Sequence, residues 1–170
     1  DIQVKSGEAV EVDFDVSVLS NLYYGFYNGT LQDWTTIDAD GDGYTWNPLG
    51  DCLFSESYTE KEWIGLTPDN YLVAPIKIAA TEKTYISFDA TSTVTYEERS
   101  KEHFGVAVST KSNTNPDDFE TIAEWTTPPR EEQWREYKVD LSKYAGKNIW
   151  VALRHFGCYK QYLLYVDNIT

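Results

Sequence analysis

Short runs rich in β-branched and aromatic residues recur along this chain, with turn-forming residues between them. The clearest run is residues 10–18, where valine and phenylalanine alternate with acidic or small polar residues. A period of two indicates a strand with one face buried and the other in water. Clusters such as Asn28-Gly29 and Thr67-Pro68-Asp69-Asn70 supply turns, and helical periodicity is almost absent. The pattern predicts an all-β fold, either a β-sandwich or a jelly roll.

The rest of the chain divides into further strand-like segments. We expect strands at residues 33–37, 71–78, 84–90, 104–110, 120–126, 135–140, 148–156 and 162–169, with single helical turns near 117–119 and 142–145. At 170 residues the chain is long enough for one well-buried core and too short for two ordinary domains. No linker or internal repeat divides it, so we expect one domain.

The balance of charge disfavours two classes of partner. Lysine and arginine number 14 against 28 aspartate and glutamate residues, for a formal net charge of -14. A protein that follows the nucleic-acid backbone needs a basic surface, which this chain lacks. The same charge opposes adsorption to anionic membranes, and no apolar run reaches the roughly 20 residues of a membrane span. We therefore expect no nucleic-acid partner and no membrane insertion.

Three aspartates at alternate positions suggest a metal site. Asp38, Asp40 and Asp42 occur in the sequence Asp-Ala-Asp-Gly-Asp-Gly, and Ca²⁺ takes six to eight oxygen ligands at about 2.3–2.6 Å. The glycine after the third aspartate permits a turn that brings the backbone carbonyl of Tyr44 inward. Position twelve of the loop is Leu49 rather than glutamate, and strand-like residues flank it. We expect a calcium loop between strands rather than an EF-hand; an acidic turn without an ion is the alternative.

Three aspartates rarely fill the coordination shell of calcium, so a further ligand is needed. Asp69 is the candidate, because it lies in a Pro-Asp-Asn segment whose residues favour a turn. Its carboxylate would complete the shell, although an ordinary turn explains the same residues equally well. Ser55 or Ser57 could add an oxygen, and nothing in the sequence decides between them.

One tryptophan has a charged neighbourhood. Trp63 occurs in Thr59-Glu-Lys-Glu-Trp-Ile64, and an exposed aromatic ring there could stack on a sugar or anchor a protein partner. The alternative is a loop aromatic that folds back over the core. We treat Trp63 as the candidate ligand-binding residue.

The cysteines and histidines give no sign of catalysis. Cys52 and Cys158 are far apart in sequence, so one long disulfide or two buried thiols are both open, and we expect them to be close in space. We expect an interior histidine bonded to a carboxylate or carbonyl at His155 rather than a catalytic one. Nucleophile-elbow, zinc-protease and phosphate-loop motifs are absent. A hydrolase built on paired carboxylates is a third, weaker function beside the two binding functions given below, because acidic residues are abundant along the whole chain.

Several phrases, in order, resemble the cleaved-adhesin domain family, the haemagglutinin/adhesin modules attached to gingipain-type cysteine proteases of oral Bacteroidetes. They include Val151-Ala-Leu-Arg-His-Phe-Gly-Cys158 and Tyr165-Val-Asp-Asn-Ile169, together with residues 34–46, 52–58, 66–72, 103–109 and 134–140. The resemblance covers about residues 22–170. It implies a galactose-binding-like jelly-roll β-sandwich that binds Ca²⁺, is secreted or displayed at the cell surface, and adheres to host proteins or glycans.

The chain also departs from the pattern of that family. Where the family has Glu-x-Phe-Glu-Asn-Gly, this chain has tyrosine at both glutamate positions, Tyr24 and Tyr27. The resemblance makes Asp167 a ligand of a second calcium site at that edge, and we expect this site to be weak or absent. Residues 1–21 fall outside the match and would be an added strand or a linker remnant packed on the domain.

Two functions of different classes follow. The first is a non-catalytic, calcium-stabilised adhesion module that binds a host extracellular-matrix or cell-surface protein or a cell-surface glycan, within a chain that carries other domains. The second is a carbohydrate-binding module that targets an attached glycanase or protease. Two or three exposed aromatic rings on a concave sheet face would favour the glycan module, and an aromatic-poor sheet face would favour protein adhesion.

Overall fold

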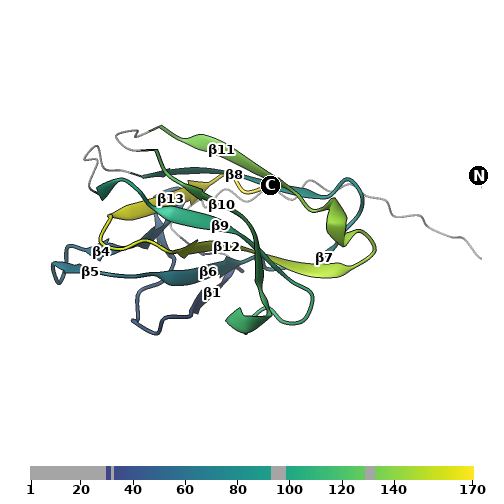
Figure 1. Ribbon diagram of the computed structural model, residues 1–170, viewed down its shortest axis with the longest axis horizontal. Helices are drawn as coiled ribbons and strands as arrows, with labels where there is room; N and C mark the ends of the chain where they lie inside the picture. The colour runs from purple at the N-terminus through teal and green to yellow at the C-terminus, as the bar shows by residue number, and fades with distance from the viewer. Residues whose placement is uncertain (1–29, 32, 93–98, 129–132) are drawn as a thin grey trace, which may run out of the picture.

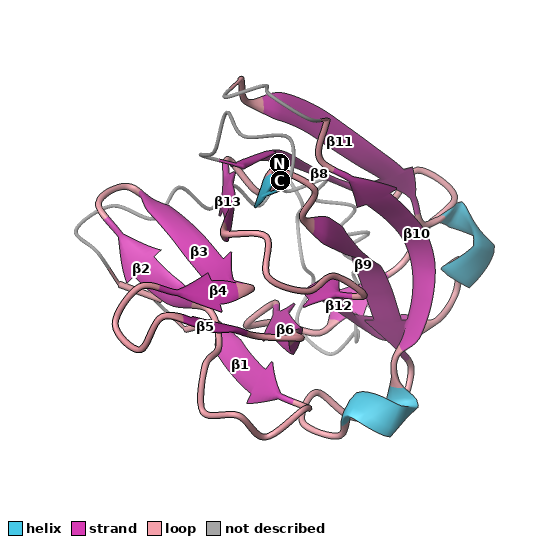
Figure 2. Ribbon diagram, turned by 60° about the vertical axis from the view of Figure 1, so that its left-hand side comes forward, coloured by secondary structure: helices cyan, strands magenta, loops and turns pink. Residues whose placement is uncertain are grey.

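Two antiparallel sheets stack face to face in a computed structural model that describes residues 30–31, 33–92, 99–128 and 133–170 (Figure 1). The strand expected at residues 10–18, the proposed boundary at residue 21, and Tyr24 and Tyr27 all lie outside the described residues. Strands make up almost all of the regular structure, as the sequence predicts (Figure 2). The all-β sandwich is therefore confirmed.

One sheet has the strand order β1-β6-β12-β9-β10, with β7 paired to β12. Its strands are β1 (Thr35–Asp38), β6 (Asp69–Val73), β7 (Ile78–Ala79), β9 (His103–Ser109), β10 (Glu120–Thr126) and β12 (Asn148–Phe156). We call it the β12 sheet.

The other sheet has the order β11-β8-β13-β3-β2 and is called the β8 sheet. It contains β2 (Asn47–Leu49), β3 (Cys52–Glu56), β8 (Tyr85–Ser92), β11 (Arg135–Asp140) and β13 (Leu163–Asp167). A separate hairpin pairs β4 (Tyr58–Thr59) with β5 (Ile64–Gly65). Single 3₁₀ turns occur at Pro116–Asp118 and Ser142–Tyr144, where the sequence predicts helical turns.

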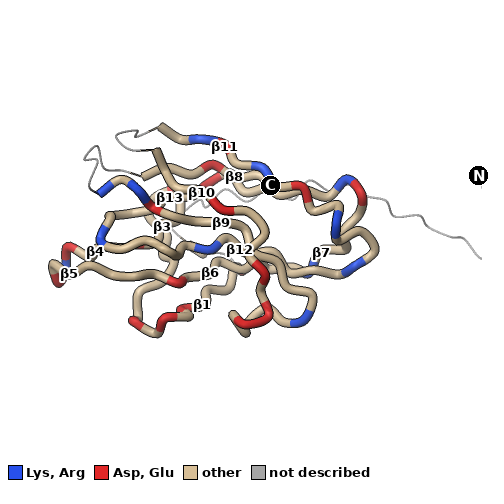
Figure 3. The backbone as a smooth tube through the Cα atoms, in the orientation of Figure 1, with Lys and Arg blue, Asp and Glu red and all other residues tan. Residues whose placement is uncertain are grey.

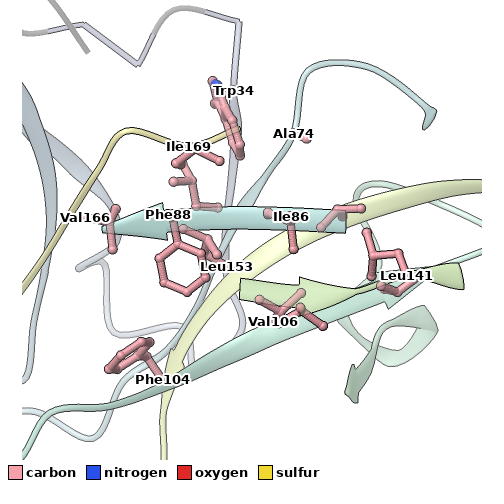
Figure 4. Packing of buried hydrophobic residues seen from close by; sticks show 14 of the residues in the cluster. Trp34, Ala74, Ile86, Phe88, Phe104, Val106, Leu141, Leu153, Val166 and Ile169 are labelled. Carbon is pink, nitrogen blue, oxygen red and sulfur yellow. The ribbon is translucent and has the colours of Figure 1, made fainter. Parts of the chain in front are cut away.

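Alternation along β12 places the main core between the sheets. Ile149, Val151 and Leu153 are at most 2% exposed and face the β8 sheet. Phe88 of β8 meets Phe104 of β9 edge to face, with ring centroids 6.2 Å apart (Figure 4). Such pairs add to the free energy gained by burying the rings.

The outer face of the β12 sheet carries a second, smaller cluster. Tyr71, Val73 and Ala152 point away from the main core, and Phe119 of the segment before β10 packs over them. The rings of Tyr71 and Phe119 lie 5.5 Å apart. Because this face is covered by side chains, Tyr71 is only 3% exposed.

Two stretches differ from the sequence prediction. The single strand expected at 71–78 is divided into β6 and β7, because Pro75 has no N–H to donate to a neighbouring strand. We expected no strand between residues 37 and 71, but residues 47–56 form the β2–β3 hairpin. Leu49 pairs with Cys52, and Gly50 takes a φ of 62° at the first turn position, which favours glycine.

The cysteines are not neighbours, which corrects our expectation that they would be close. Both are free thiols. The Sγ of Cys52 donates to the Leu49 carbonyl at 3.2 Å, whereas Cys158 contacts Glu102 and His155. Within the described residues, no helix is long and apolar enough to cross a membrane.

Candidate metal sites and contact surface

The acidic loop follows directly from β1, at one edge of the β12 sheet. Carboxylate oxygens of Asp38, Asp40 and Asp42 lie within 4.8 Å of one another. The loop is shaped by its own backbone: Gly41 and Gly43 donate N–H groups to Asp38 at 2.8 and 2.9 Å, and Tyr44 donates to Asp42 at 2.8 Å. Acidic residues gather where the chain leaves β1 (Figure 3). The sequence thus predicted the convergence of the three aspartates correctly.

The loop concentrates negative charge. Partial burial of its carboxylate, and then the negative charge of Asp42, raise the pKa of Asp40 to about 6. The Asp69 N–H donates to Asp40 Oδ1 at 3.3 Å and opposes that shift. A divalent cation would remove the repulsion among these carboxylates, so the donor set and the charge fit Ca²⁺.

Asp69 lies beside the loop, but its carboxylate is occupied. Arg154 of β12 donates to both oxygens, from Nε at 2.7 Å and from Nη2 at 2.8 Å. The backbone of Asp69 also holds the loop, because its carbonyl accepts the Ala39 N–H at 2.9 Å. We expected the Asp69 carboxylate to be a fourth ligand; in the structure it is held by Arg154, and the backbone of Asp69 supports the loop.

Asp167 belongs to a different place. It lies at the end of β13 and lines a surface pocket of about 380 Å³ with Asp51, Asp89, Cys52 and Trp134, among others. None of the three loop aspartates lines this pocket. Asp167 is therefore not a ligand of the loop site, and the second site predicted for it stays a prediction.

Trp63 is exposed. It lies in the β4–β5 turn and is 75% exposed, which excludes the alternative in which it covers the core. Its φ of 57° is left-handed, which is uncommon for a bulky residue. Ile64 is 42% exposed and Tyr159 is 59% exposed. A Cβ added at Gly65 would lie 2.9 Å from Tyr159 Cε2, so the Tyr159 ring packs against this hairpin. We call Trp63, Ile64 and Tyr159 the Trp63 surface.

A buried polar cluster was not predicted as a unit. Glu102 and His155 are fully buried, and Glu102 Oε2 lies 3.0 Å from His155 Nε2. The Cys158 Sγ lies 3.4 Å from the same carboxylate oxygen and 3.3 Å from the same imidazole nitrogen. The interior role expected for His155 is confirmed. Sequence gave no signal for Glu102, because one glutamate among many acids carries no distinguishing pattern.

The two serines proposed for the calcium loop belong to this cluster instead. Ser55 Oγ lies 2.8 Å from His155 Nδ1, and Ser57 donates to both oxygens of Glu102 at 3.0 and 2.8 Å. Both serines are fully buried. They fill the hydrogen-bonding capacity of a buried acid and imidazole, which would otherwise be costly to bury.

The two stacked antiparallel sheets define the class of this protein as a β-sandwich domain. A xylan-binding domain from Paenibacillus barcinonensis has a TM-score of 0.51 with 12% identity, covering 88% of this chain and 96% of that one. A likeness at this identity shows the fold alone.

Within that class, the chain belongs to the Cleaved Adhesin Domain family, whose sequence profile matches residues 19–170. It is 34% identical over 165 residues to Hemagglutinin A of Porphyromonas gingivalis, and 31% identical over 172 residues to Lys-gingipain of the same organism. These alignments cover 81% and 88% of this chain but only 7% and 10% of the relatives, so the chain spans a small part of their length. A crystal structure of a cleaved adhesin domain of Lys-gingipain has a TM-score of 0.72 at 29% identity, covering 87% of this chain and 95% of that one.

Proposed function

We propose that this domain is a non-catalytic adhesion module, stabilised by calcium, that works outside the cell as part of a longer chain. The single observation that carries the proposal is the exposure of Trp63, at 75%, on a domain of this family. The name of the relative Hemagglutinin A supports the adhesive role. The small share of Hemagglutinin A and Lys-gingipain that this chain covers supports its place in a longer chain.

The Trp63 surface is the proposed contact. Exposed aromatic rings are enriched at the centres of protein interfaces, where they bury much area at low entropic cost. The hairpin that carries Trp63 lies beyond one end of the β12 sheet (Figure 1). Trp63 and Tyr159 therefore stand at the tip of the sandwich, where a partner can reach both.

On the β12 sheet, the structure favours a protein partner over a glycan held on the sheet face. Among the described residues, no large exposed hydrophobic side chain lies in β1, β6, β9, β10 or β12. Tyr71 of β6, next to the central strand of that sheet, is covered by Phe119, and the Arg154 guanidinium lies 4.9 Å from its ring centre. An aromatic platform for a sugar chain is thus missing from the described part of this face.

The proposed calcium ligands are Asp38, Asp40 and Asp42, with the Tyr44 carbonyl and water completing the shell. Bound Ca²⁺ would offset both causes of the raised Asp40 pKa, the burial of the carboxylate and the negative charge of Asp42. It would hold the loop against β6, to which the backbone of Asp69 already joins it. The ion has a structural role in this proposal, since the loop and the Trp63 surface share no residue.

The buried cluster supports a non-catalytic reading. Burial, and then the charge of Glu102, raise the pKa of the Cys158 thiol to about 12. A thiol with so high a pKa is protonated at neutral pH and is a poor nucleophile. The carboxylate and the sulfur also contact the same imidazole nitrogen. A nucleophile–histidine–acid triad needs the acid on the opposite nitrogen.

The test uses three proteins in calcium-containing buffer: wild type, Trp63→Ala and Trp134→Ala. Trp134 is a matched control, because it is 46% exposed and lines the separate Asp167 pocket. Each protein is measured against immobilised extracellular-matrix proteins and against a glycan array. We expect wild type and Trp134→Ala to bind a matrix protein and Trp63→Ala to lose that binding. Glycan binding without protein binding would establish the carbohydrate-binding module instead, and equal binding by all three would overturn the proposed surface.

A further inference from the structure

Three different ligand types converge at one buried point. Glu102 Oε2, His155 Nε2 and Cys158 Sγ form a triangle with sides of 3.0, 3.3 and 3.4 Å. Around a tetrahedral zinc ion with bonds of about 2.0–2.3 Å, neighbouring ligand atoms lie about 3.3–3.6 Å apart. The triangle needs to expand by only a few tenths of an ångström to accept such an ion.

We propose that Glu102, His155 and Cys158 form a second metal site, for a divalent transition-metal ion such as Zn²⁺, separate from the acidic loop. The donor set is one oxygen, one nitrogen and one sulfur. Sulfur and imidazole select zinc and related ions, whereas Ca²⁺ and Mg²⁺ take oxygen ligands. On binding, the metal replaces the thiol proton, which passes to the buffer, and the sulfur binds as thiolate.

The surroundings of the cluster match what such sites require. A metal-bound histidine usually donates its other ring N–H to a fixed acceptor, and His155 Nδ1 lies 2.8 Å from Ser55 Oγ. Ser55 is itself held by Asn70, whose Nδ2 donates to the same oxygen at 3.2 Å. The Glu102 carboxylate is likewise oriented by Ser57. The ligands are thus held in place by their neighbours.

Access and fold position also suit a metal site. Cys158 is half-buried, whereas Glu102 and His155 are fully buried, so Cys158 is the member of the cluster nearest solvent. The three ligands come from the end of β12, the turn after it, and the residue before β9. A bound ion would therefore join the end of β12 and its following turn to the residue before β9.

That position has a consequence for the Trp63 surface. Tyr159 follows Cys158 directly, and Lys160 donates its N–H to the Leu66 carbonyl at 3.3 Å, just beyond β5. A metal at Cys158 would stiffen the turn that carries Tyr159 against the β4–β5 hairpin. This consequence rests on the proposed function, but the metal site does not, and the experiments below do not measure adhesion.

The first experiment titrates metal-free protein with Co²⁺ while Ca²⁺ saturates the acidic loop. A thiolate-to-cobalt charge-transfer band reports sulfur ligation, which oxygen sites do not give. We expect the band in wild type and in Cys52→Ser, its loss in Cys158→Ser, and its displacement by equimolar Zn²⁺. Cys52 is the matched control because it is the other free cysteine of the chain. No band in wild type, or a band that depends on Cys52, overturns the proposal.

The second experiment begins with wild-type protein, so its main result does not depend on whether a variant folds. Wild-type protein is alkylated with and without one equivalent of Zn²⁺, and each cysteine is followed by peptide mass spectrometry. Because the protonated Cys158 thiol reacts slowly, the reaction runs until a measurable fraction of Cys158 is modified in the metal-free sample. We expect Zn²⁺ to slow modification of Cys158 and to leave Cys52 unchanged; equal rates at Cys158 in both samples contradict the site. Ser55→Ala then tests the positioning role of Ser55. It should lower zinc affinity by about 10–100-fold, the usual effect of removing such a partner.

Discussion

Arg154 holds Asp69 through two parallel hydrogen bonds of 2.7 and 2.8 Å, joining β12 to the strand that supports the acidic loop. The third contact of the guanidinium, from Nη1 to Thr121 Oγ1 at 2.9 Å, extends the link to β10. Arg154 thus crosses the outer face of the β12 sheet. Binding a metal through the Asp69 carboxylate would require breaking this pair, and a bidentate arginine–carboxylate pair is among the stronger polar interactions in proteins.

The first prediction separates Asp69 from the calcium ligands. Asp69→Asn should keep the rise in melting temperature that calcium produces, whereas Asp40→Asn should lose it, because only Asp40 offers its carboxylate to the ion. Differential scanning fluorimetry with and without chelator measures both. If Asp69→Asn loses the calcium response as fully as Asp40→Asn does, Asp69 is a ligand after all.

The second prediction concerns the strength of the Arg154 pair. The side chains of Arg154 and Asp69 are 22% and 32% exposed. We therefore expect Arg154→Met to lower the free energy of unfolding by about 1–2 kcal/mol, less than the loss of a fully buried charged hydrogen bond would cost, because solvent screens the pair. Urea unfolding in chelator measures the change without calcium. Lys111→Met is the matched control, because Lys111 is 75% exposed at its own pair with Asp118. An equal loss in both variants would show that Arg154 has no special role.

The third prediction is that calcium stabilises the fold through one tight site. At a free calcium concentration 100 times the dissociation constant, binding adds about 2.7 kcal/mol, which corresponds to a rise in melting temperature of about 5–10 °C for a chain of this size. Asp33→Asn, an exposed aspartate just before β1, should behave as wild type. Calorimetric titration should find one tight site; two tight sites of similar affinity would mean that the Asp167 pocket also binds well.

The sequence predicted the sandwich well because alternation and turn residues are local signals. Eight expected strands agree with observed ones apart from small shifts at their ends and the break at Pro75. The acidic loop could be predicted equally well, since its three aspartates lie within five consecutive residues. By contrast, the cluster of Glu102, His155 and Cys158 forms only when distant segments meet. Glu102 and His155 are 53 positions apart, and no local pattern encodes that contact.

The fourth prediction uses the lowered pKa of Asp140. The Ser142 N–H donates to its carboxylate at 2.8 Å, and the backbone and side chain of Ser142 hold the pKa of Asp140 below its usual range. A lowered pKa in the folded state means that the stabilisation is present above the ordinary aspartate pKa of about 3.9 and is lost as pH falls through the folded value. Asp140→Ala should therefore be less stable than wild type at neutral pH, and the difference in free energy of unfolding should shrink in acid.

Urea unfolding from neutral to acid pH measures this difference, with Glu82→Ala as an exposed control. A difference that stays constant with pH would refute the role of the Asp140 carboxylate.

The last prediction concerns the backbone at Trp63. Its φ of 57° is left-handed, a conformation that glycine adopts freely and other residues only at a cost. Trp63→Ala and Trp63→Gly remove the same exposed ring, but only glycine relieves the strain. We expect Trp63→Gly to be more stable than Trp63→Ala by about 1 kcal/mol, although glycine usually destabilises a protein relative to alanine. At Lys61, an exposed residue of the same turn whose φ is not positive, the alanine variant should instead be more stable than the glycine variant. If alanine is the more stable at position 63 as well, the left-handed conformation is not maintained in solution, and the Trp63 ring is not presented as the structure has it.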